Sequence, residues 1–108
     1  MISYTLKGVT LQRSSELIPE DTLDRAVEIL KAIGHHNRLQ IVNILLSGEL
    51  SVKQLVDRLG LLQSHTSIQL SILRWHGILK SRRDGSKTYY SLANDSIKKI
   101  VKLIIADI

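Results

Sequence analysis

The chain has 108 residues, of which 44% are hydrophobic and 23% charged, and it carries a formal net charge of +5. This length holds one domain with a modest core, and the hydrophobic content excludes an intrinsically disordered chain. The absence of cysteine excludes disulfides, thiolate metal sites and cysteine-based redox sensing. No apolar run approaches a membrane span and the first residues lack the apolar segment of a signal peptide, so we expect a cytoplasmic protein without a membrane partner.

Residues 1–18 are weakly patterned, and their sequence is compatible with an arm, a short strand or an additional helix. A first helix is predicted to begin at Pro19, where acidic residues fill the first turn, and to end at Gly34. We therefore divide the chain into an N-terminal arm, residues 1–18, and one domain, residues 19–108, whose first and last helices serve dimerisation.

A second helix and a short strand are predicted to follow. Asn37 is the expected cap of this helix, because its side-chain oxygen can accept a hydrogen bond from a free backbone N–H. Ser47-Gly48 stops the helix, and Glu49-Leu50 is predicted to form a short strand.

The next segment has the layout of a helix-turn-helix. Ser51 is expected to cap a short helix, with Gln54 in the capping-box position. A tight turn at Gly60 leads into a longer helix over residues 63–76. The residues predicted to face the core from this longer helix are Thr66, Leu70 and Leu73.

A basic β-hairpin is predicted directly after these helices. Its strands cover residues 78–83 and 87–92, and Asp84-Gly85 forms the turn. A last helix begins at Asn94 or Asp95. The predicted fold is therefore mainly α with a small β-hairpin wing (α+β): a winged helix-turn-helix of about five helices and a two- or three-stranded antiparallel sheet.

The positive charge lies beside the helix-turn-helix. Residues 1–48 carry five acids and five bases, whereas residues 49–108 carry five acids and ten bases. On a hairpin that follows a recognition helix, such an excess favours phosphate contact over a solvated surface. The residues predicted to contact the DNA backbone are Lys53, Arg74, Arg82, Arg83 and Lys87. Double-stranded DNA is therefore the expected partner.

The N-terminal end of the longer helix is where side chains are expected to meet base edges. Glutamine can pair with adenine, serine with several bases, and isoleucine can contact a thymine methyl. The predicted base-reading residues are Gln63, Ser64, His65, Ser67 and Ile68.

The terminal helices carry apolar stripes that predict a symmetric homodimer. Such a stripe can also cover the chain's own core, but here it is almost entirely isoleucine and continues to the final residue. The predicted interface residues are Leu23, Val27, Leu30, Ile97, Ile100, Val101, Ile104 and Ile105. In a dimer, the two recognition helices would reach successive major grooves about 34–36 Å apart and read an inverted repeat.

From Ala32 to Leu92 the sequence resembles the ArsR/SmtB group of bacterial and archaeal winged-helix repressors. The ordered set that carries the resemblance is Arg38-Leu39, Gly48-Glu49-Leu50, Leu55, Leu59-Gly60-Leu61, Gln63-Ser64, Ser67, Leu70, Leu73-Arg74, Gly77 and Tyr89-Tyr90-Ser91-Leu92. The resemblance implies a homodimer that binds operator DNA and often represses its own operon. Many relatives release DNA when a metal ion binds.

Two departures from the family argue against metal sensing. Ser51 and Lys53 stand where metal-sensing members place a Cys-x-Cys pair, and an ammonium group cannot replace a thiolate ligand. The last helix has no histidine, and its only acids are Asp95 and Asp107. We expect no metal and no other cofactor. The four histidines, which are His35, His36, His65 and His76, are better explained by capping, a surface role or a pH response.

Ile68, Ile72 and Trp75 form a second apolar stripe on the predicted recognition helix, where the family usually has polar residues at Ile68 and Trp75. We expect Ile72 and Trp75 to pack beneath the wing or against the other subunit. The alternative is a winged-helix protein-interaction module with weak or lost DNA binding. If the protein is a DNA-binding repressor, replacing both Arg82 and Arg83 by alanine would abolish DNA binding. If it is a protein-interaction module, Ile68→Asp would abolish binding of the partner protein. An effector, either a protein or a small molecule, stays open, and no arrangement of residues indicates an enzyme.

Overall fold

The structure is a computed structural model that describes residues 2–6 and 8–108, with side chains from residue 14 onward. Its elements in chain order are β1 (Ile2–Leu6), β2 (Val9–Arg13), α1 (Glu20–Ile33), α2 (His36–Ile44), η1 (Leu45–Ser47), β3 (Leu50–Ser51), α3 (Val52–Leu59), α4 (Gln63–Trp75), β4 (Leu79–Asp84), β5 (Lys87–Leu92) and α5 (Asp95–Ala106). The described part thus contains five α-helices and an antiparallel sheet in the order β3-β5-β4, which confirms the predicted winged helix-turn-helix class.

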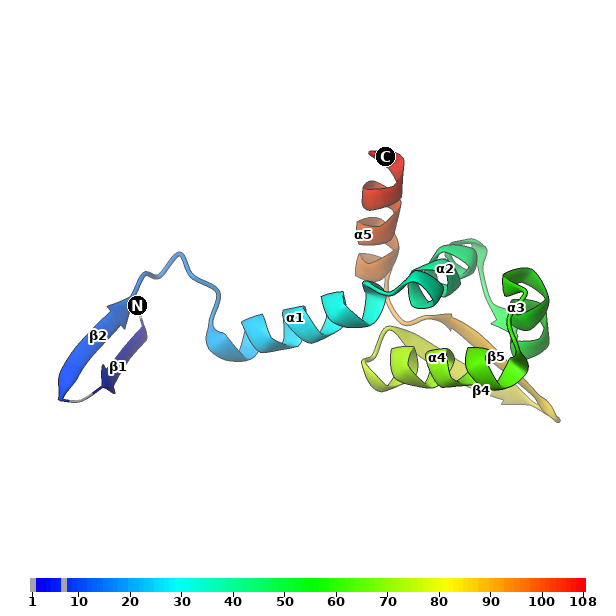
Figure 1. The fold of residues 1–108 in the computed structure, drawn as a ribbon, viewed down its shortest axis with the longest axis horizontal. Helices are drawn as coiled ribbons and strands as arrows, with labels where there is room; N and C mark the ends of the chain where they lie inside the picture. Colours follow the sequence, from blue (N-terminus) through cyan, green and yellow to red (C-terminus); the bar gives the residue numbers. More distant parts are fainter. Residues whose placement is uncertain (1, 7) are drawn as a thin grey trace.

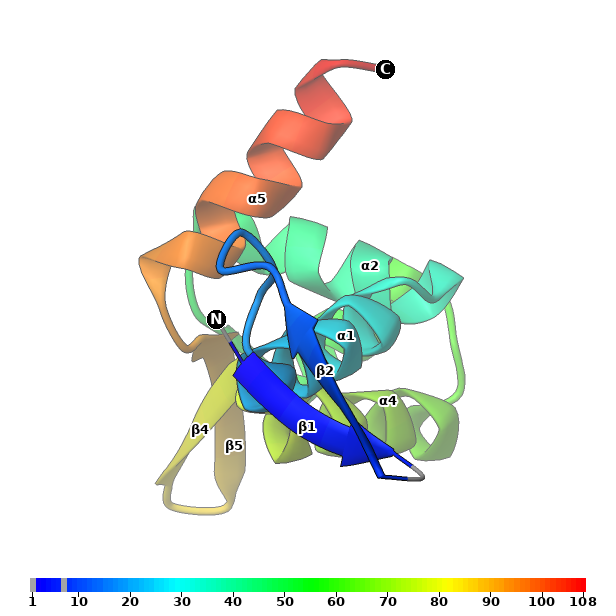
Figure 2. The same ribbon diagram turned by 90° about the vertical axis from the view of Figure 1, so that its left-hand side faces the viewer.

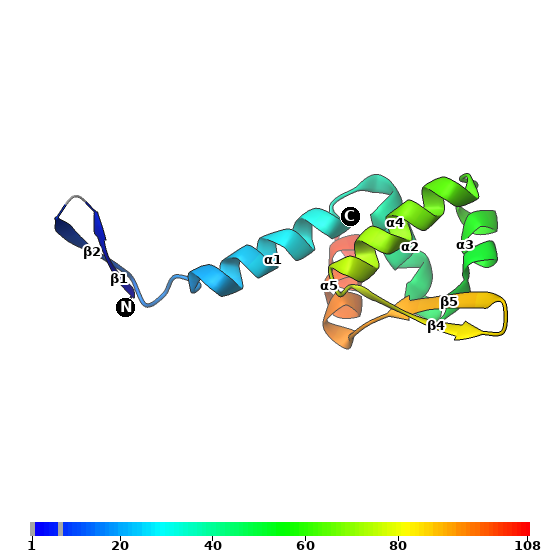
Figure 3. The same cartoon turned by 90° about the horizontal axis from the view of Figure 1, so that it is seen from below.

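The helices α2, α3 and α4 and the three-stranded sheet form a compact body, from which α1 projects to one side and α5 to another (Figure 1). The β1–β2 hairpin lies beyond the free end of α1. Figure 3, which views the molecule from below, shows the same separation, and Figure 2 views the molecule from the hairpin end, with the hairpin in front. In the described residues, no helix is long and apolar enough to cross a membrane.

Side-chain caps set the boundaries of three helices. Ser51 Oγ accepts a hydrogen bond from the Gln54 N–H at 3.1 Å, and Gln54 Oε1 accepts one from the Ser51 N–H at 2.8 Å, which is the predicted capping box of α3. Asn94 Oδ1 accepts a hydrogen bond from the Ile97 N–H and starts α5. The predicted Asn37 cap of α2 is wrong: His35 Nδ1 accepts from the Asn37 N–H at 3.2 Å, so the helix begins at His36.

One core joins the helices to the sheet. Leu55, Leu70 and Leu73 are completely buried, as are Ile41 and Val101 of the neighbouring helices. The sheet closes this core with its own buried residues, Leu79 and Leu92. The predicted inward face of α4 is therefore correct, and Thr66 completes it by donating a hydrogen bond from Oγ1 to the Leu62 carbonyl at 3.0 Å.

Arg38 of α2 connects two further helices. Its Nε donates to the Ala32 carbonyl at the end of α1, and its Nη1 donates to Gln69 Oε1 of α4 at 2.9 Å. Gln69 is itself buried. A charged donor that satisfies a buried amide and a helix-end carbonyl fixes the orientation of both helices.

The core predicts a difference between two neighbouring positions of α4. Leu70 is 0% exposed and Ile68 is 58% exposed. Leu70→Ala is expected to lower the free energy of unfolding by about 2–5 kcal/mol, because it leaves a cavity in the core. Ile68→Ala, the control on the same helix, should change it by less than about 0.5 kcal/mol. Urea denaturation measures both values, and equal losses would contradict this assignment of the two faces.

Candidate DNA-binding interface

Helix α4 presents one face to the core and the other to solvent. The outer face carries Ser64, Ile68, Ser71 and Trp75, all of which are exposed. The turn before this helix is possible because Gly60 adopts a left-handed conformation with φ of 67°, which ends α3 sharply. The body of the protein thus holds α4 in place while the outer face stays free.

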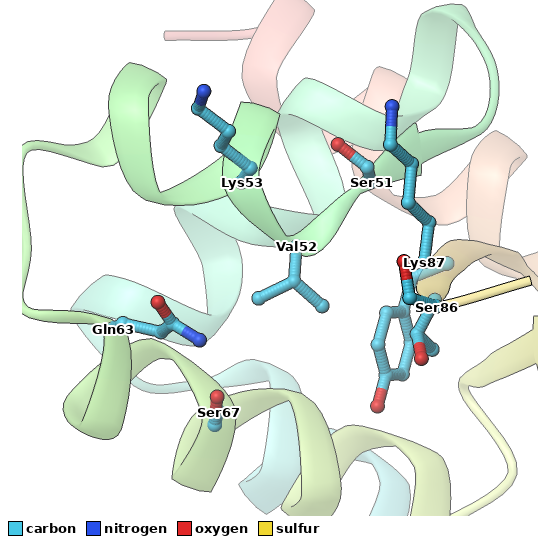
Figure 4. A pocket seen from close by; sticks show the side chains of 9 residues that line it. Ser51, Val52, Lys53, Gln63, Ser67, Ser86 and Lys87 are labelled. Atoms are coloured by element: carbon cyan, nitrogen blue, oxygen red, sulfur yellow. The ribbon is translucent and has the colours of Figure 1, made fainter.

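A hollow of about 440 Å³ lies between α3, the N-terminal half of α4 and the tip of the wing (Figure 4). Its lining comes from all three elements and consists of Ser51, Val52, Lys53, Gln63, Ser67, Ser86, Lys87, Thr88 and Tyr90. Val52 lies at its centre, opposite Gln63 and Ser67 of α4, and Lys53 and Lys87 extend away from α4 at the far side.

The chemistry of this hollow suits an anion. Five of its nine lining residues carry hydroxyl groups and two carry ammonium groups, while none carries a carboxylate. Hydroxyl, amide and ammonium donors are the groups that proteins use to hold DNA phosphates. A backbone phosphate that enters between α4 and the wing therefore meets donors on both sides.

The five predicted base-reading residues lie at the N-terminal end of α4, but they differ in orientation and contact. Gln63 and Ser67 line the hollow, whereas Ser64 and Ile68 lie on the outer face. His65 is exposed, and its Nε2 lies 3.1 Å from Asn37 Nδ2 at the start of α2. His65 is therefore anchored to α2, and its role in reading bases stays a prediction.

Two of the predicted backbone-contacting arginines lie on opposite faces of the wing. Arg82 forms a two-pronged ion pair with Glu49, with N–O distances of 2.8 and 2.7 Å, and its guanidinium stands 4.6 Å above the Tyr89 ring centre. This hydrogen-bonded pair lowers the pKa of Glu49 and raises that of Arg82. Arg83 pairs in register with Thr88, which lines the hollow, so it shares the face of the sheet that α4 covers.

The other predicted cations are also separated. Lys53 of α3 and Lys87 of the wing both line the hollow. Arg74 lies near the C-terminal end of α4 with Ser71 and Trp75, at a second surface depression. The structure therefore brings Lys53 and Lys87 to the hollow, whose lining does not include Arg83, and leaves Arg74 apart from them.

The predicted dimer residues separate into two groups. Val27, Leu30, Ile100, Ile104 and Ile105 are exposed and Leu23 is half-buried, so all six are available to a partner. Ile97 and Val101 are buried in the chain's own core, so their assignment to the interface is wrong: the first turns of α5 cover the body, and only its later turns project.

Of the two positions expected for Trp75, the one beneath the wing is wrong, and the one against the other subunit stays a prediction. Its side chain is 86% exposed, so it does not pack beneath the wing, whereas Ile72 is half-buried. Trp75 stands beside His76, whose Nδ1 lies 2.9 Å from the Ile72 carbonyl and whose Nε2 lies 3.7 Å from Glu28 Oε2 of α1. The end of α4 therefore contacts α1.

Sequence reasoning missed several residues of this surface. Ser86, Thr88 and Tyr90 line the hollow, and Glu49 holds Arg82. Alternation along β5 could have identified Thr88 and Tyr90 as neighbours on one face. Leu103 of α5, which is also exposed, was not among the predicted residues. No group of three or more potential metal ligands occurs among the described residues.

Comparisons with known proteins agree with this architecture. A family model described as "Bacterial regulatory protein, arsR family" matches residues 35–81. The transcriptional activator HlyU of Vibrio cholerae is 39% identical over 80 residues, which cover 74% of this chain and 74% of that protein. A biofilm growth-associated repressor of Agrobacterium fabrum is 35% identical over 85 residues, which cover 76% of this chain and 73% of the repressor.

Solved structures give the same result. HlyU of Vibrio cholerae superposes with a TM-score of 0.76 at 37% identity, over 80% of this chain and 94% of that one. A homodimeric winged helix-turn-helix DNA-binding domain of Mycobacterium bovis superposes with a TM-score of 0.75 at 29% identity, over 82% of this chain and 83% of that one. The chain therefore belongs to the arsR family of transcriptional regulators, which are DNA-binding proteins rather than enzymes.

Proposed function

We propose that this protein is a homodimeric repressor that binds an inverted-repeat operator. The observation that carries the proposal is the hollow between α3, α4 and the wing, which is lined by hydroxyl and ammonium groups and lacks carboxylates. Repression is proposed from the repressor of Agrobacterium fabrum, whereas HlyU of Vibrio cholerae is a transcriptional activator. The homodimeric domain of Mycobacterium bovis supports the proposed dimer.

In the proposed complex, α4 enters the major groove with its N-terminal end. Ser64 and Ile68 face the base edges, with Gln63 and Ser67 at the margin next to the hollow. The DNA backbone passes through the hollow, where Lys53 and Lys87 neutralise phosphates. A two-fold axis between the subunits repeats this arrangement about 34–36 Å away, which requires an inverted repeat.

The proposed control of DNA binding does not use a cysteine metal site. The side chain of Ser51 caps α3, and Lys53 contributes a positive charge where an anionic ligand would be needed. The chain also contains no cysteine. The effector is therefore a protein or a small molecule, or the repressor acts through its own abundance.

A second function is favoured by one observation. Ile68 and Trp75 are 58% and 86% exposed on the outer face of α4, as the contact surface of a protein-interaction module would be. Under that alternative, Ile68→Asp abolishes partner binding and the wing arginines have no role. Under the repressor proposal, binding depends on the wing and prefers operator to scrambled DNA.

Removing the two lysines of the hollow tests the proposed path of the DNA backbone. Lys53→Ala with Lys87→Ala should weaken binding to operator and scrambled duplex alike, and should lower the slope of log affinity against log salt by about one for each phosphate that is no longer neutralised. Fluorescence anisotropy with DNA from upstream of the protein's own gene, across a salt series, measures both effects. Lys99→Ala with Lys102→Ala removes the same charge from α5 and is the control. Equal weakening in the two double variants would show that the hollow does not hold the backbone.

The ion pair on the wing predicts unequal roles for its arginines. Arg83→Ala should weaken DNA binding more than Arg82→Ala, because Glu49 already neutralises the guanidinium of Arg82. Glu49→Gln should tighten binding, since it leaves the charge of Arg82 free for phosphate. The same anisotropy titration compares the three variants. An effect of Arg82→Ala as large as that of Arg83→Ala would contradict the assignment.

The proposed dimer depends on the later turns of α5. Ile104 is exposed and continues the stripe of Ile97 and Val101 beyond the core. Ile104→Asp should raise the dimer dissociation constant by about tenfold or more, because each subunit then buries an unpaired carboxylate. Sedimentation equilibrium measures this constant. Lys99→Asp, on the opposite side of the helix, is the control and should leave it unchanged.

A further inference from the structure

The N-terminal β1–β2 hairpin has one apolar and one polar face. Its register sets Tyr4 opposite Leu11 and Thr5 opposite Thr10. Residues directly opposite each other in an antiparallel pair share a face, and successive residues alternate between faces. One face therefore holds the positions of Ile2, Tyr4, Leu6, Val9 and Leu11, with Arg13 opposite Ile2 at the end away from the turn, and the other holds those of Ser3, Thr5, Thr10 and Gln12.

The chain's own body lies far from this hairpin. Figures 1 and 3 both show the hairpin beyond the free end of α1, while the compact body lies at the other end of that helix. An isolated two-stranded hairpin is marginally stable in water unless its apolar face packs against something. The hairpin therefore needs a surface outside its own domain.

Exposed apolar residues connect this hairpin to the proposed dimer interface. Val27 and Leu30 are exposed on α1, and Leu17 and Ile18 are exposed in the segment that joins α1 to the hairpin. A partner that covers α1 thus meets exposed apolar residues both on the helix and in the segment that leads to the hairpin. In the homodimer of the proposed function, on which this step rests, the partner is a second copy of the chain.

Symmetry identifies the surface of the second copy that the hairpin reaches. A two-fold axis that crosses a pair of α1 helices makes them antiparallel, so the N-terminal end of one lies beside the C-terminal half of the other. That half of α1 borders a hollow of about 230 Å³ at the end of α4, lined by Arg25, Glu28, Ile29, Trp75 and His76. Trp75 is the largest exposed apolar side chain there.

We propose that the β1–β2 hairpin of each subunit lies over Trp75 of the other subunit, with its apolar face against the indole. The contact then occurs twice in the symmetric dimer, and each subunit contributes its hairpin to one contact and its Trp75 to the other. The contact clamps the end of the recognition helix to the partner. The arsR family model matches residues 35–81, which include Trp75 but not the hairpin, so only the hairpin half of this clamp lies outside the matched segment.

Trp75 is the only tryptophan in the chain, so its fluorescence reports the contact directly. The test variant is Tyr4→Asp with Leu11→Asp, on the apolar face. The control is Thr5→Asp with Thr10→Asp, on the polar face. In each double variant the two new carboxylates lie directly opposite each other, and the two variants use neighbouring positions of the register. The added charge and the repulsion across the strands are therefore matched.

In the full-length dimer without DNA, Trp75 should be protected from acrylamide quenching. The apolar-face variant should lose this protection and shift its emission to the red, while the polar-face variant behaves as the wild type. Sedimentation equilibrium on each sample establishes the assembly state. A monomeric wild type would overturn both the proposed dimer and the clamp. A dimer in which Trp75 is quenched equally in all three proteins, or protected only after DNA is added, would overturn the clamp alone.

Discussion

The orientation of α4 relative to α1 depends on one side chain, that of Arg38. It joins the last turn of α1 to Gln69, an amide buried on α4, through two charge-assisted hydrogen bonds. The recognition surface and the proposed dimerisation helix are therefore positioned from the same point. In a dimer, the separation of the two recognition helices follows from this angle, and so does the spacing of the half-sites that they can read.

The wing owes its shape to a second constraint. Glu49 precedes β3, and its carboxylate holds Arg82 against the ring of Tyr89 on the outer face of the sheet. The wing is thereby tied to the start of the helix-turn-helix through a side-chain contact as well as through the β3–β5 ladder. Thr88 and Tyr90 of the opposite face border the hollow, together with Ser86 and Lys87 at the tip of the wing.

Local signals in the sequence were sufficient for most of the fold. The capping box at Ser51 and the inward face of α4 were predicted correctly because each depends on a few neighbouring residues. The third strand was placed one residue early, and His35 replaced Asn37 as a cap because an imidazole nitrogen can also accept a hydrogen bond.

Features that depend on tertiary contacts were not predictable in the same way. The apolar stripe of α5 does not distinguish the residues that pack in the chain's own core from those that are exposed. Ile97 and Val101 were therefore assigned to the dimer interface although they are buried in the core. The pairing of Arg82 with Glu49 joins residues 33 apart in the sequence, and nothing local distinguishes Arg82 from Arg83. The lining of the hollow required the wing to be placed against α3 and α4 in space.

Helix α4 carries no lysine or arginine before Arg74, whereas the cations around the hollow come from α3 and the wing. The groups proposed to attract DNA and those proposed to recognise its bases thus belong to different elements. Substitutions at the outer positions of α4 could then redirect such a regulator to another operator while leaving its general attraction to DNA intact. After gene duplication, a copy of this protein would acquire a different operator preference through substitutions at a few uncharged positions, and it would keep its non-specific affinity for DNA.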